Sequence, residues 1–289
     1  MSKLTKKQER EGRWNSYKKN PLSLTLKILV NFSAIVTVGI LLLLILYILI
    51  KGIPNMHLSL FEWEYNSVNV SMMPAIINTV TMTALSLLIA IPLGVFSAIY
   101  LVEYAKRGNK LVSVIRTTAE TLSGIPSIVY GLFGYLLFVI ACGFSYSIIA
   151  GALTLSIMVL PVILRTTEEA LKAVPDSYRE GSFGLGAGRL RTVFRIVLPS
   201  AVPGIIAGII LSIGRIVGET AALIYTSGTV AGIPDSIFSS GRTLSIHMYA
   251  LLSEGLYMNQ AYATAVVLLI MVIGINALSN FVAKKITAR

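Results

Sequence analysis

Charged residues and cysteine are scarce in this chain of 289 residues. Only 13% of the residues are charged, about half of the roughly 25% found in an average soluble domain. The single cysteine, Cys142, excludes an internal disulfide, and together with two histidines, His57 and His247, it offers too few ligands for a zinc or redox-metal cluster. We therefore expect no metal site and no cofactor, and a water-soluble fold is hard to build from this composition.

Hydrophobic residues make up 55% of the chain and are gathered into long uncharged runs. The run over residues 28–50 contains no charged residue and exceeds the roughly 20 residues that cross a bilayer core. It is too long for the apolar region of a signal peptide, and it ends at Lys51 without a small-residue cleavage site. An all-α integral membrane protein with six transmembrane helices is predicted, with spans at residues 28–50, 74–100, 125–141, 147–164, 202–224 and 261–283.

Lysine and arginine are concentrated between these spans and at the two ends of the chain. Eight precede the first span, four lie in residues 103–116, six in residues 165–195 and three after the last span, which accounts for 21 of 24. Under the positive-inside rule this distribution places both termini in the cytoplasm. A nucleic-acid-binding role would use the same net charge of +11, but the charges are divided over four segments that topology already explains, so we expect no nucleic-acid partner.

The chain is predicted to consist of a basic cytoplasmic tail, residues 1–27, and one transmembrane domain, residues 28–289, with no convincing internal repeat. In the tail, Trp14, Tyr17 and Lys18 are suited to the level of the lipid headgroups. A short amphipathic helix along the membrane interface is expected before the third span. Its apolar face would carry Leu111, Val114, Ile115, Ala119 and Leu122, and its polar face Arg116 and Glu120.

A connecting loop, residues 165–199, links the fourth and fifth spans. Asp176 or Ser177 can cap a short helix in this loop, with Glu180 in the first turn and the glycines of residues 184–188 at its end. Across the loop, the residues Glu180, Gly186, Ile196, Leu198 and Pro199 follow the spacing E-x5-G-x9-I-x-L-P.

This spacing resembles the cytoplasmic coupling loop of importer permeases in the ABC transporter superfamily. The resemblance implies that the short helix docks in a groove of an ATPase subunit, with Glu180 and Gly186 as contacts. Gly181 and Ser182 stand where alanines are common in the family, and glycine costs about 1 kcal/mol relative to alanine inside a helix. The alternative is an ordinary basic connector whose glycines only make turns. Because no G-x-x-x-x-G-K-[ST] motif occurs, we do not expect this chain to hydrolyse ATP itself.

Two further segments, residues 120–134 and 214–223, resemble the PstA-type permease of phosphate-specific importers. The resemblance implies a type I importer fold in which residues 74–283 form the core and the first span wraps a partner. It also implies a second, similar permease, two cytoplasmic ATPase subunits and an extracytoplasmic phosphate-binding protein, in the cell membrane of a prokaryote. Phosphate would cross by alternating access, without chemistry on the phosphate.

Within the fifth predicted span, Arg215 and Glu219 are spaced i, i+4. Charged groups at mid-bilayer rarely face lipid, so their shared face is expected to point inward, where Arg215 offers a fork of donors suited to phosphate oxygens and Glu219 offsets its charge. The alternative is a purely structural ion pair. Arg165 is a second candidate for the inner exit, or else a topological anchor. Asn78 and Thr79 would either line a wet path or bond across helices.

Three other functions remain open from the sequence. The same machinery could carry phosphonate, sulfate or molybdate, because arginine donors do not by themselves choose among oxyanions. An ion-coupled secondary transporter would require inverted repeats and broken helices around several buried ionisable groups. A membrane scaffold or phosphate sensor would bind ATPase subunits without uptake.

Overall fold

The computed structural model describes residues 21–106 and 108–287, and all regular elements in these ranges are helices. The residues Trp14, Tyr17 and Lys18 lie outside the described ranges. The chain divides into two compact units, Met1–Lys51 and Gly52–Arg289, which are described in turn.

The described part of the first unit is one long helix, α2 (Pro21–Gly52). Its 32 residues correspond to about 48 Å at a rise of about 1.5 Å per residue. The hydroxyls of Thr25 and Thr37 donate to the carbonyls of Pro21 and Ser33 one turn back, so both hydroxyl groups have a hydrogen-bond partner within the helix. Apolar side chains are exposed along the helix within the unit, which is typical of a helix that lipid or another subunit covers.

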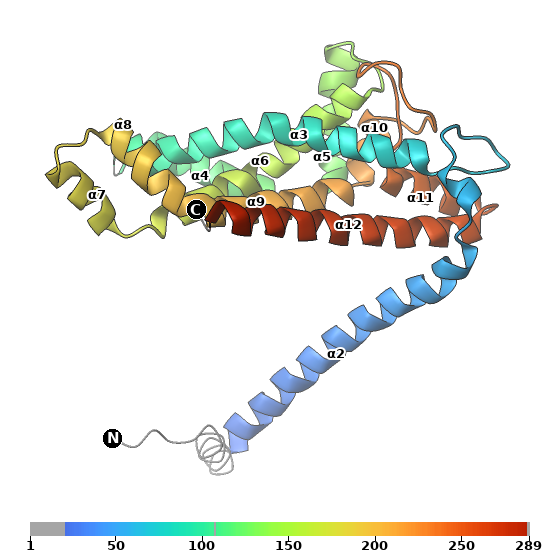
Figure 1. Cartoon of the computed structure of the whole chain (residues 1–289), viewed down its shortest axis with the longest axis horizontal. Coiled ribbons are helices and arrows are strands. Elements are labelled where there is room, and N and C mark those ends of the chain that lie inside the picture. Colours follow the sequence, from blue (N-terminus) through green and yellow to red (C-terminus); the bar gives the residue numbers. More distant parts are fainter. Residues whose placement is uncertain (1–20, 107, 288–289) are drawn as a thin grey trace. The chain divides into compact units, whose positions relative to one another are not determined.

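The second unit is a bundle of helices of very different lengths (Figure 1). Four long helices run along it: α3, α6, α9 and α12. Shorter elements lie between them and at both ends of the bundle. The elements are η1 (Ile53–Asn55), η2 (Leu58–Phe61), α3 (Met73–Ile99), η3 (Tyr100–Tyr104), α4 (Lys110–Ser123), α5 (Ser127–Gly134), η4 (Tyr135–Ala141), α6 (Ile148–Lys172), α7 (Asp176–Gly184), α8 (Arg189–Thr192), η5 (Val193–Val197), α9 (Leu198–Val217), α10 (Ala221–Thr226), α11 (Leu244–Glu254) and α12 (Met258–Thr287).

Helix α6 is the centre of this bundle. It packs against α3 on one side and α9 on another, and α12 packs against α9 and α11. The main core lies along α6, where Leu155, Met158 and Val159 are fully buried against Met82 of α3 and Leu223 of α10. Arg165 lies on this helix, and Arg215 lies on α9, which packs against it.

The predicted spans are confirmed as helices, with one correction. Five helices are long and apolar enough to cross a membrane, and the bent pair formed by Lys110–Ser123 and Ser127–Ala141 makes a sixth. This pair bends by 106° at residues 124–126, where Gly124 is the C-cap of the first helix and Pro126, with an extended backbone, is the N-cap of the second. The fifth predicted span is not continuous to residue 224, because α9 ends at Val217 and α10 begins anew at Ala221.

The amphipathic helix before the third span is present as α4, and two residues of its predicted apolar face, Ile115 and Ala119, pack against the bundle. Leu111 and Val114 are exposed, whereas Val112 is buried and packs near Leu101 and Leu164. The reason is that α4 packs along α6, where the guanidinium of Arg116 pairs with Glu168 at 2.5 Å. The ion pair fixes the rotation of the helix, and the side chains beside it face the bundle.

Candidate translocation and coupling sites

Arg215 lies in the last turn of α9 and is half-buried. No acidic side chain of the described residues forms an ion pair with it. Its guanidinium is close enough to Tyr130 of α5 to interact electrostatically. The hydroxyl of Tyr130 donates to the carbonyl of Leu122 at 2.8 Å, which links α5 back to the end of α4. Arg215 therefore lies beside the bend between these two helices.

Glu219 lies in the break between α9 and α10, so the predicted i, i+4 pair on one helix face is wrong. The C-cap of α9 is Gly218, which ends the helix before Glu219 is reached. Glu219 is 8% exposed, and its Oε1 accepts a hydrogen bond at 3.0 Å from the backbone N–H of Ala222. An acceptor at this position satisfies a free N–H at the start of α10. Glu219 orders the break rather than neutralising Arg215.

The two segments singled out in the sequence, residues 120–134 and 214–223, meet in the structure. Helices α5 and α10 approach so closely that a Cβ added to Gly131 would lie 2.7 Å from the Cα of Ala222. Both segments contain a helix break, and Arg215 lies next to both. Because a broken helix exposes backbone donors and acceptors that lipid cannot satisfy, such breaks occur where protein or a polar cavity covers them. A permanent cation between two breaks can hold an anion part-way along the spans.

Arg165 lies on α6 with its side chain 61% exposed. Its Nε donates to Glu169 at 3.1 Å, and Nη1 lies 4.0 Å from Glu120 of α4. These charges line a cavity of about 190 Å³ between the two helices. The structure thus separates Arg165 from Arg215, and a role of Arg165 at an inner exit stays a prediction.

Asn78 and Thr79 bond across segments. The Nδ2 of Asn78 donates to the carbonyls of Gly232 and Arg242 at 3.0 and 3.2 Å. The hydroxyl oxygen of Thr79 accepts from the N–H of Leu244 at 2.8 Å. Of the two alternatives for these residues, the structure supports the structural one, because their polar groups hold the segment before α11 against α3.

The short helix expected in the connecting loop is α7, and Gly186 ends it as predicted. Gly186 has a φ of +80°, in the left-handed region that glycine adopts without strain. The N–H of Gly186 donates to Phe183 and that of Ala187 to Ser182, the hydrogen-bond pair of a Schellman motif. Glu180 is exposed on this helix. An exposed helix with a sharp, glycine-dependent end is suited to docking in a groove of a partner.

The predicted start of α7 is wrong. Pro175 is the N-cap, and neither Asp176 nor Ser177 caps the helix with its side chain. Glu180 consequently falls in the second turn rather than the first. The carboxylate of Asp176 instead accepts from Nη1 of Arg179 at 3.1 Å, because this arginine gathers the acceptors around the helix start.

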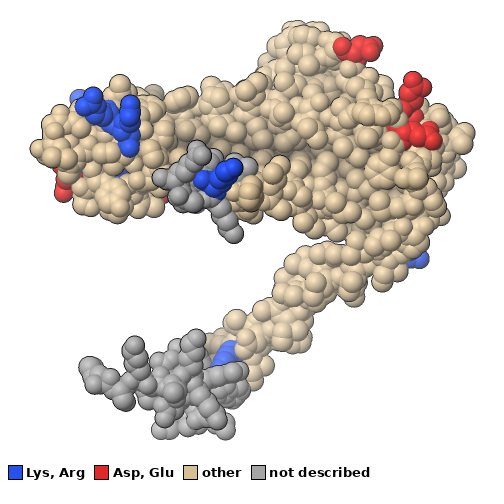
Figure 2. All heavy atoms as spheres, in the orientation of Figure 1, with Lys and Arg blue, Asp and Glu red and all other residues tan. Residues whose placement is uncertain are grey.

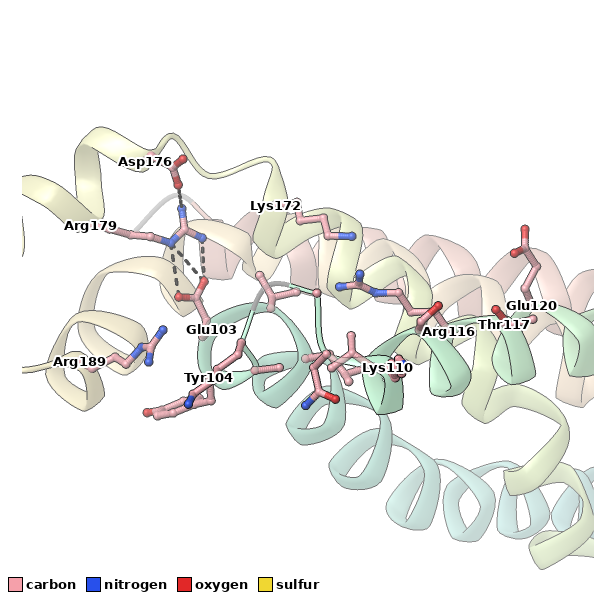
Figure 3. A pocket seen from close by; sticks show the side chains of 18 residues that line it. Glu103, Tyr104, Lys110, Arg116, Thr117, Glu120, Lys172, Asp176, Arg179 and Arg189 are labelled. Atoms are coloured by element: carbon pink, nitrogen blue, oxygen red, sulfur yellow. Dashed lines mark hydrogen bonds and ion pairs between the residues drawn. The ribbon is translucent and has the colours of Figure 1, made fainter.

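Arg179 and Glu103 form a buried ion pair that was not predicted (Figure 3). Their side chains are 15% and 7% exposed, and Nη2 of Arg179 lies 2.7 Å from Oε1 of Glu103. Arg179 also donates to the carbonyls of Leu171 and Val174 at 3.0 and 2.9 Å. The hydrogen bond that Arg179 donates to Glu103 is the main cause that raises the pKa of Arg179. The pair ties α7 to the end of the α3 span, and a separation of 76 residues gives no local sequence signal.

Ser182 explains one departure from the usual coupling-loop sequence. Its hydroxyl is buried and lies 2.8 Å from that of Thr192 in α8, so it joins the two short helices of the loop. Alanine at this position would lose that bond. At Gly181, in contrast, an added Cβ would meet nothing within 4 Å.

The ion pair of Arg179 and Glu103 lies at the edge of a cavity of about 1060 Å³ between α4, α7, α8 and the end of the α3 span (Figure 3). Its lining contains more basic than acidic side chains. In the orientation of Figure 2, lysines and arginines gather at the end of the bundle with α7 and α8, and acidic groups at the opposite end. The basic side chains in the lining are Lys106, Lys110, Arg116, Lys172, Arg179 and Arg189.

The chain is similar in sequence to ABC transporter permeases. A probable ABC transporter permease protein of Bacillus subtilis (strain 168), YqgI, is 35% identical over 277 residues, which cover 88% of this chain and 94% of the relative. The phosphate transport system permease protein PstA of Yersinia pestis is 34% identical over 245 residues, or 81% of each chain.

The fold is also shared with solved transporters. A bacterial alginate ABC transporter, solved in complex with an alginate pentasaccharide-bound periplasmic protein, has a chain that superposes with a TM-score of 0.68 over 95% of this chain and 98% of its own length. At 17% identity this likeness shows the fold alone, and it confirms the predicted all-α, type I importer permease architecture. The family model described as binding-protein-dependent transport system inner membrane component matches residues 90–289. The chain belongs to this family and is a multi-pass permease of an ABC importer.

Proposed function

We propose that this chain is the permease subunit of an ATP-driven importer that moves inorganic phosphate into the cytoplasm by alternating access. The observation that carries the proposal is the meeting of residues 120–134 and 214–223 beside Arg215, a cation with no acidic partner among the described residues. The names of relatives support the substrate: besides the Yersinia protein, the phosphate transport system permease protein PstA of Mycobacterium leprae is 38% identical over 205 residues.

Arg215 binds the passing anion in this proposal. Its planar fork of donors matches two phosphate oxygens, and its charge does not depend on pH. Glu219 holds the start of α10 in place and so fixes the wall beside the guanidinium. Because no carboxylate competes for Arg215, the donors are free to meet the substrate, and a change in the two helix breaks can release it.

The energy for this movement comes from partner subunits. Two cytoplasmic ATPases dock on the coupling helices, here through Glu180 and the turn at Gly186. A second, similar permease completes the path, and an extracytoplasmic binding protein delivers phosphate. Arg165 belongs to the inner exit, and both termini lie in the cytoplasm of a prokaryotic cell. ATP hydrolysis occurs on the partners.

The replacement Arg215→Gln tests the proposal in cells that lack other phosphate uptake systems. Loss of a charged hydrogen-bonding group costs about 1.5–3 kcal/mol, so uptake of labelled phosphate should fall at least about tenfold. Arg215→Lys, which keeps the charge but not the fork, should be intermediate. Immunoblots of membranes check that the amounts are equal. Wild-type uptake by Arg215→Gln would contradict the pathway role.

Competition by other oxyanions tests the substrate separately. Excess sulfate, molybdate or phosphonate should leave the uptake of labelled phosphate unchanged. Inhibition by one of these anions, together with uptake of that anion, would replace phosphate as the substrate and leave the permease assignment intact.

A further inference from the structure

Arg242 is a buried arginine without an acidic partner in the described part of the chain. It is 5% exposed, and its Nε and Nη2 atoms are buried without any hydrogen bond. His247, one turn into α11, is 1% exposed, and both of its ring nitrogens are also without a partner. Buried polar groups are nearly always paired, because an unpaired charge is costly in a medium of low dielectric constant. These four nitrogens, two on each side chain, lack hydrogen-bond partners, which indicates a site for a ligand.

An aromatic ring covers this pair. The guanidinium carbon of Arg242 lies 4.6 Å from the centroid of the Tyr65 ring, and the ring of His247 meets that of Tyr65 edge-on at 6.1 Å. Burial and the nearby charge of Arg242 lower the pKa of His247 to about 3, so its ring is neutral and can donate one hydrogen bond. Helix α11 has 11 residues and is not one of the spans.

Acidic side chains are near in sequence to Tyr65 but do not pair with Arg242. Glu62 and Glu64 are exposed, and Glu62 accepts from Nδ2 of Asn69 at 2.6 Å. The same stretch, residues 62–71, hereafter the lid segment, carries Tyr65 onto the guanidinium. The chain thus has carboxylates available and leaves the arginine unneutralised, as a site for an incoming anion requires.

The lid segment contains backbone strain. Val70 has a φ of +47°, a left-handed conformation that a β-branched residue rarely adopts, and its side chain is buried. Such strain occurs at ligand clamps and switch regions, where it favours a second conformation. Since Arg242 and His247 are buried under Tyr65, an anion reaches them only when the lid segment moves.

The cluster is connected to the candidate translocation site. Asn78 of α3 donates to the carbonyl of Arg242, and three residues later the hydroxyl of Ser245 donates to the carbonyl of Glu219 at 2.5 Å. Helix α11 lies at the end of the bundle opposite α7 and α8 (Figure 1). Arg242 therefore lies on the side of Arg215 that is away from the coupling helix.

We propose that Arg242 and His247 form an outer oxyanion-binding site, covered by Tyr65, at which the substrate is held before it reaches Arg215. This proposal rests on the proposed function, since it assigns a second site to the same anion. The guanidinium supplies the charge and two donors, the neutral imidazole a third, and the lid segment opens when the anion arrives and closes behind it.

Arg242→Gln separates a site from a structural role. The replacement breaks no ion pair but loses the contact of the guanidinium with the Tyr65 ring, so a purely structural arginine would lower uptake and ATP hydrolysis together. We expect phosphate uptake by the complete transporter in proteoliposomes to fall at least about tenfold, as for the loss of a charged donor. Arg242→Lys should recover part of it. Asp235→Asn, which removes an exposed charge in the segment before α11, is the control and should transport normally.

The ratio of phosphate transported to ATP hydrolysed is the second measurement. Loss of the outer site lowers the amount of phosphate transported per ATP hydrolysed, because the binding protein still stimulates the ATPases while the unbound anion returns outward. A damaged fold lowers both rates together. Unchanged uptake by Arg242→Gln, or an equal fall in uptake and ATP hydrolysis, would overturn the proposal. If the wild-type transporter carries another oxyanion and not phosphate, the proposed substrate is wrong. Uptake of that anion, and the amount transported per ATP hydrolysed, then test whether Arg242 binds it.

Discussion

Arg179 and Arg242 are buried arginines at opposite ends of the same bundle, and their surroundings differ completely. Arg179 has the carboxylates of Glu103 and Asp176 and two backbone carbonyls as acceptors. Arg242 has buried nitrogens with no acceptor and the face of Tyr65 above it. An arginine whose donors are all paired holds together the elements that it joins, whereas the guanidinium of an unpaired arginine can bind an anionic ligand. The comparison assigns positioning to the coupling end and binding to the outer end.

Positioning matters at the coupling end because α7 is a short helix that projects from the spans. It packs against η5 and α8, Ser182 bonds to Thr192, and Arg179 joins it to the end of the α3 span and the end of α6. In the proposed function, a movement imposed on α7 by a docked ATPase would pass through this ion pair to the ends of the α3 span and α6. An exposed ion pair would be screened and too weak for that task.

Arg179→Gln should have the largest effect of the changes considered for this comparison. It leaves the buried carboxylate of Glu103 unpaired, and breaking one partner of a buried pair costs about 3–5 kcal/mol. We expect a clearly lower thermal unfolding midpoint of the purified transporter and loss of uptake. Arg242→Gln should not lower the midpoint in the same way.

The double variant Glu103→Gln with Arg179→Gln is the control for this prediction. It removes both charges, so no unpaired carboxylate remains and most of the stability should return, while ATP hydrolysis stays poorly coupled to uptake. If Arg179→Gln and Arg242→Gln lower the unfolding midpoint equally, the distinction between a paired and an unpaired arginine fails.

Gly186→Ala tests the end of the coupling helix and should have an intermediate effect. Alanine in the left-handed region costs about 1–2 kcal/mol, which unwinds the last turn of α7. Co-purification of the ATPase subunits with the permease should become weaker. Gly184→Ala is the matched control two residues earlier: its φ is not positive, and an added Cβ meets nothing within 4 Å, so co-purification should be normal. Equal retention of the ATPases by both variants would contradict the role of Gly186.

Local patterns were sufficient for much of the fold. Runs of apolar residues predicted the helical spans, and the glycines of residues 184–188 predicted the end of α7, because span length and left-handed turns depend on neighbouring residues only. The separation of the amphipathic helix from the third span was predicted, but the end of α9 before Glu219 was missed, although Gly218 marks it in the sequence. Apolar runs do not show whether a helix continues through such residues.

The partners of single side chains could not be predicted from the same patterns. Arg215 was identified because its charge stands in an apolar run, but the expected partner, Glu219, is turned toward α10 by the helix break. The pair of Arg179 and Glu103 joins segments 76 residues apart. In the sequence, Arg242 is one of three basic residues outside the cytoplasmic segments and, on location alone, a candidate contact for the extracytoplasmic binding protein. The structure buries it instead, and no local pattern predicts that burial.

Broken helices were expected of an ion-coupled secondary transporter, and this chain has them. The difference lies in what surrounds the breaks. Secondary transporters place several ionisable groups at the site to couple ions to the substrate. Here the described residues beside the breaks supply one free cation, Arg215, and one carboxylate, Glu219, that caps a helix. Since the chain belongs to the ABC importer permease family, the breaks do not by themselves indicate an ion-coupled secondary transporter.

Gly181→Ala should have the smallest effect and refines the account of the coupling end. An alanine at this position meets no neighbour within 4 Å and gains about 1 kcal/mol of helix propensity, so α7 should be slightly more stable and uptake unchanged. Ser182→Ala, in contrast, removes the bond to Thr192 and should loosen α7 from α8. Thermal unfolding and uptake of the two variants distinguish these cases. Loss of uptake by Gly181→Ala with unchanged stability would mean that the ATPase groove fits closely against the bare backbone at Gly181, which would place the docking contact on that face of α7 and not at Glu180 alone.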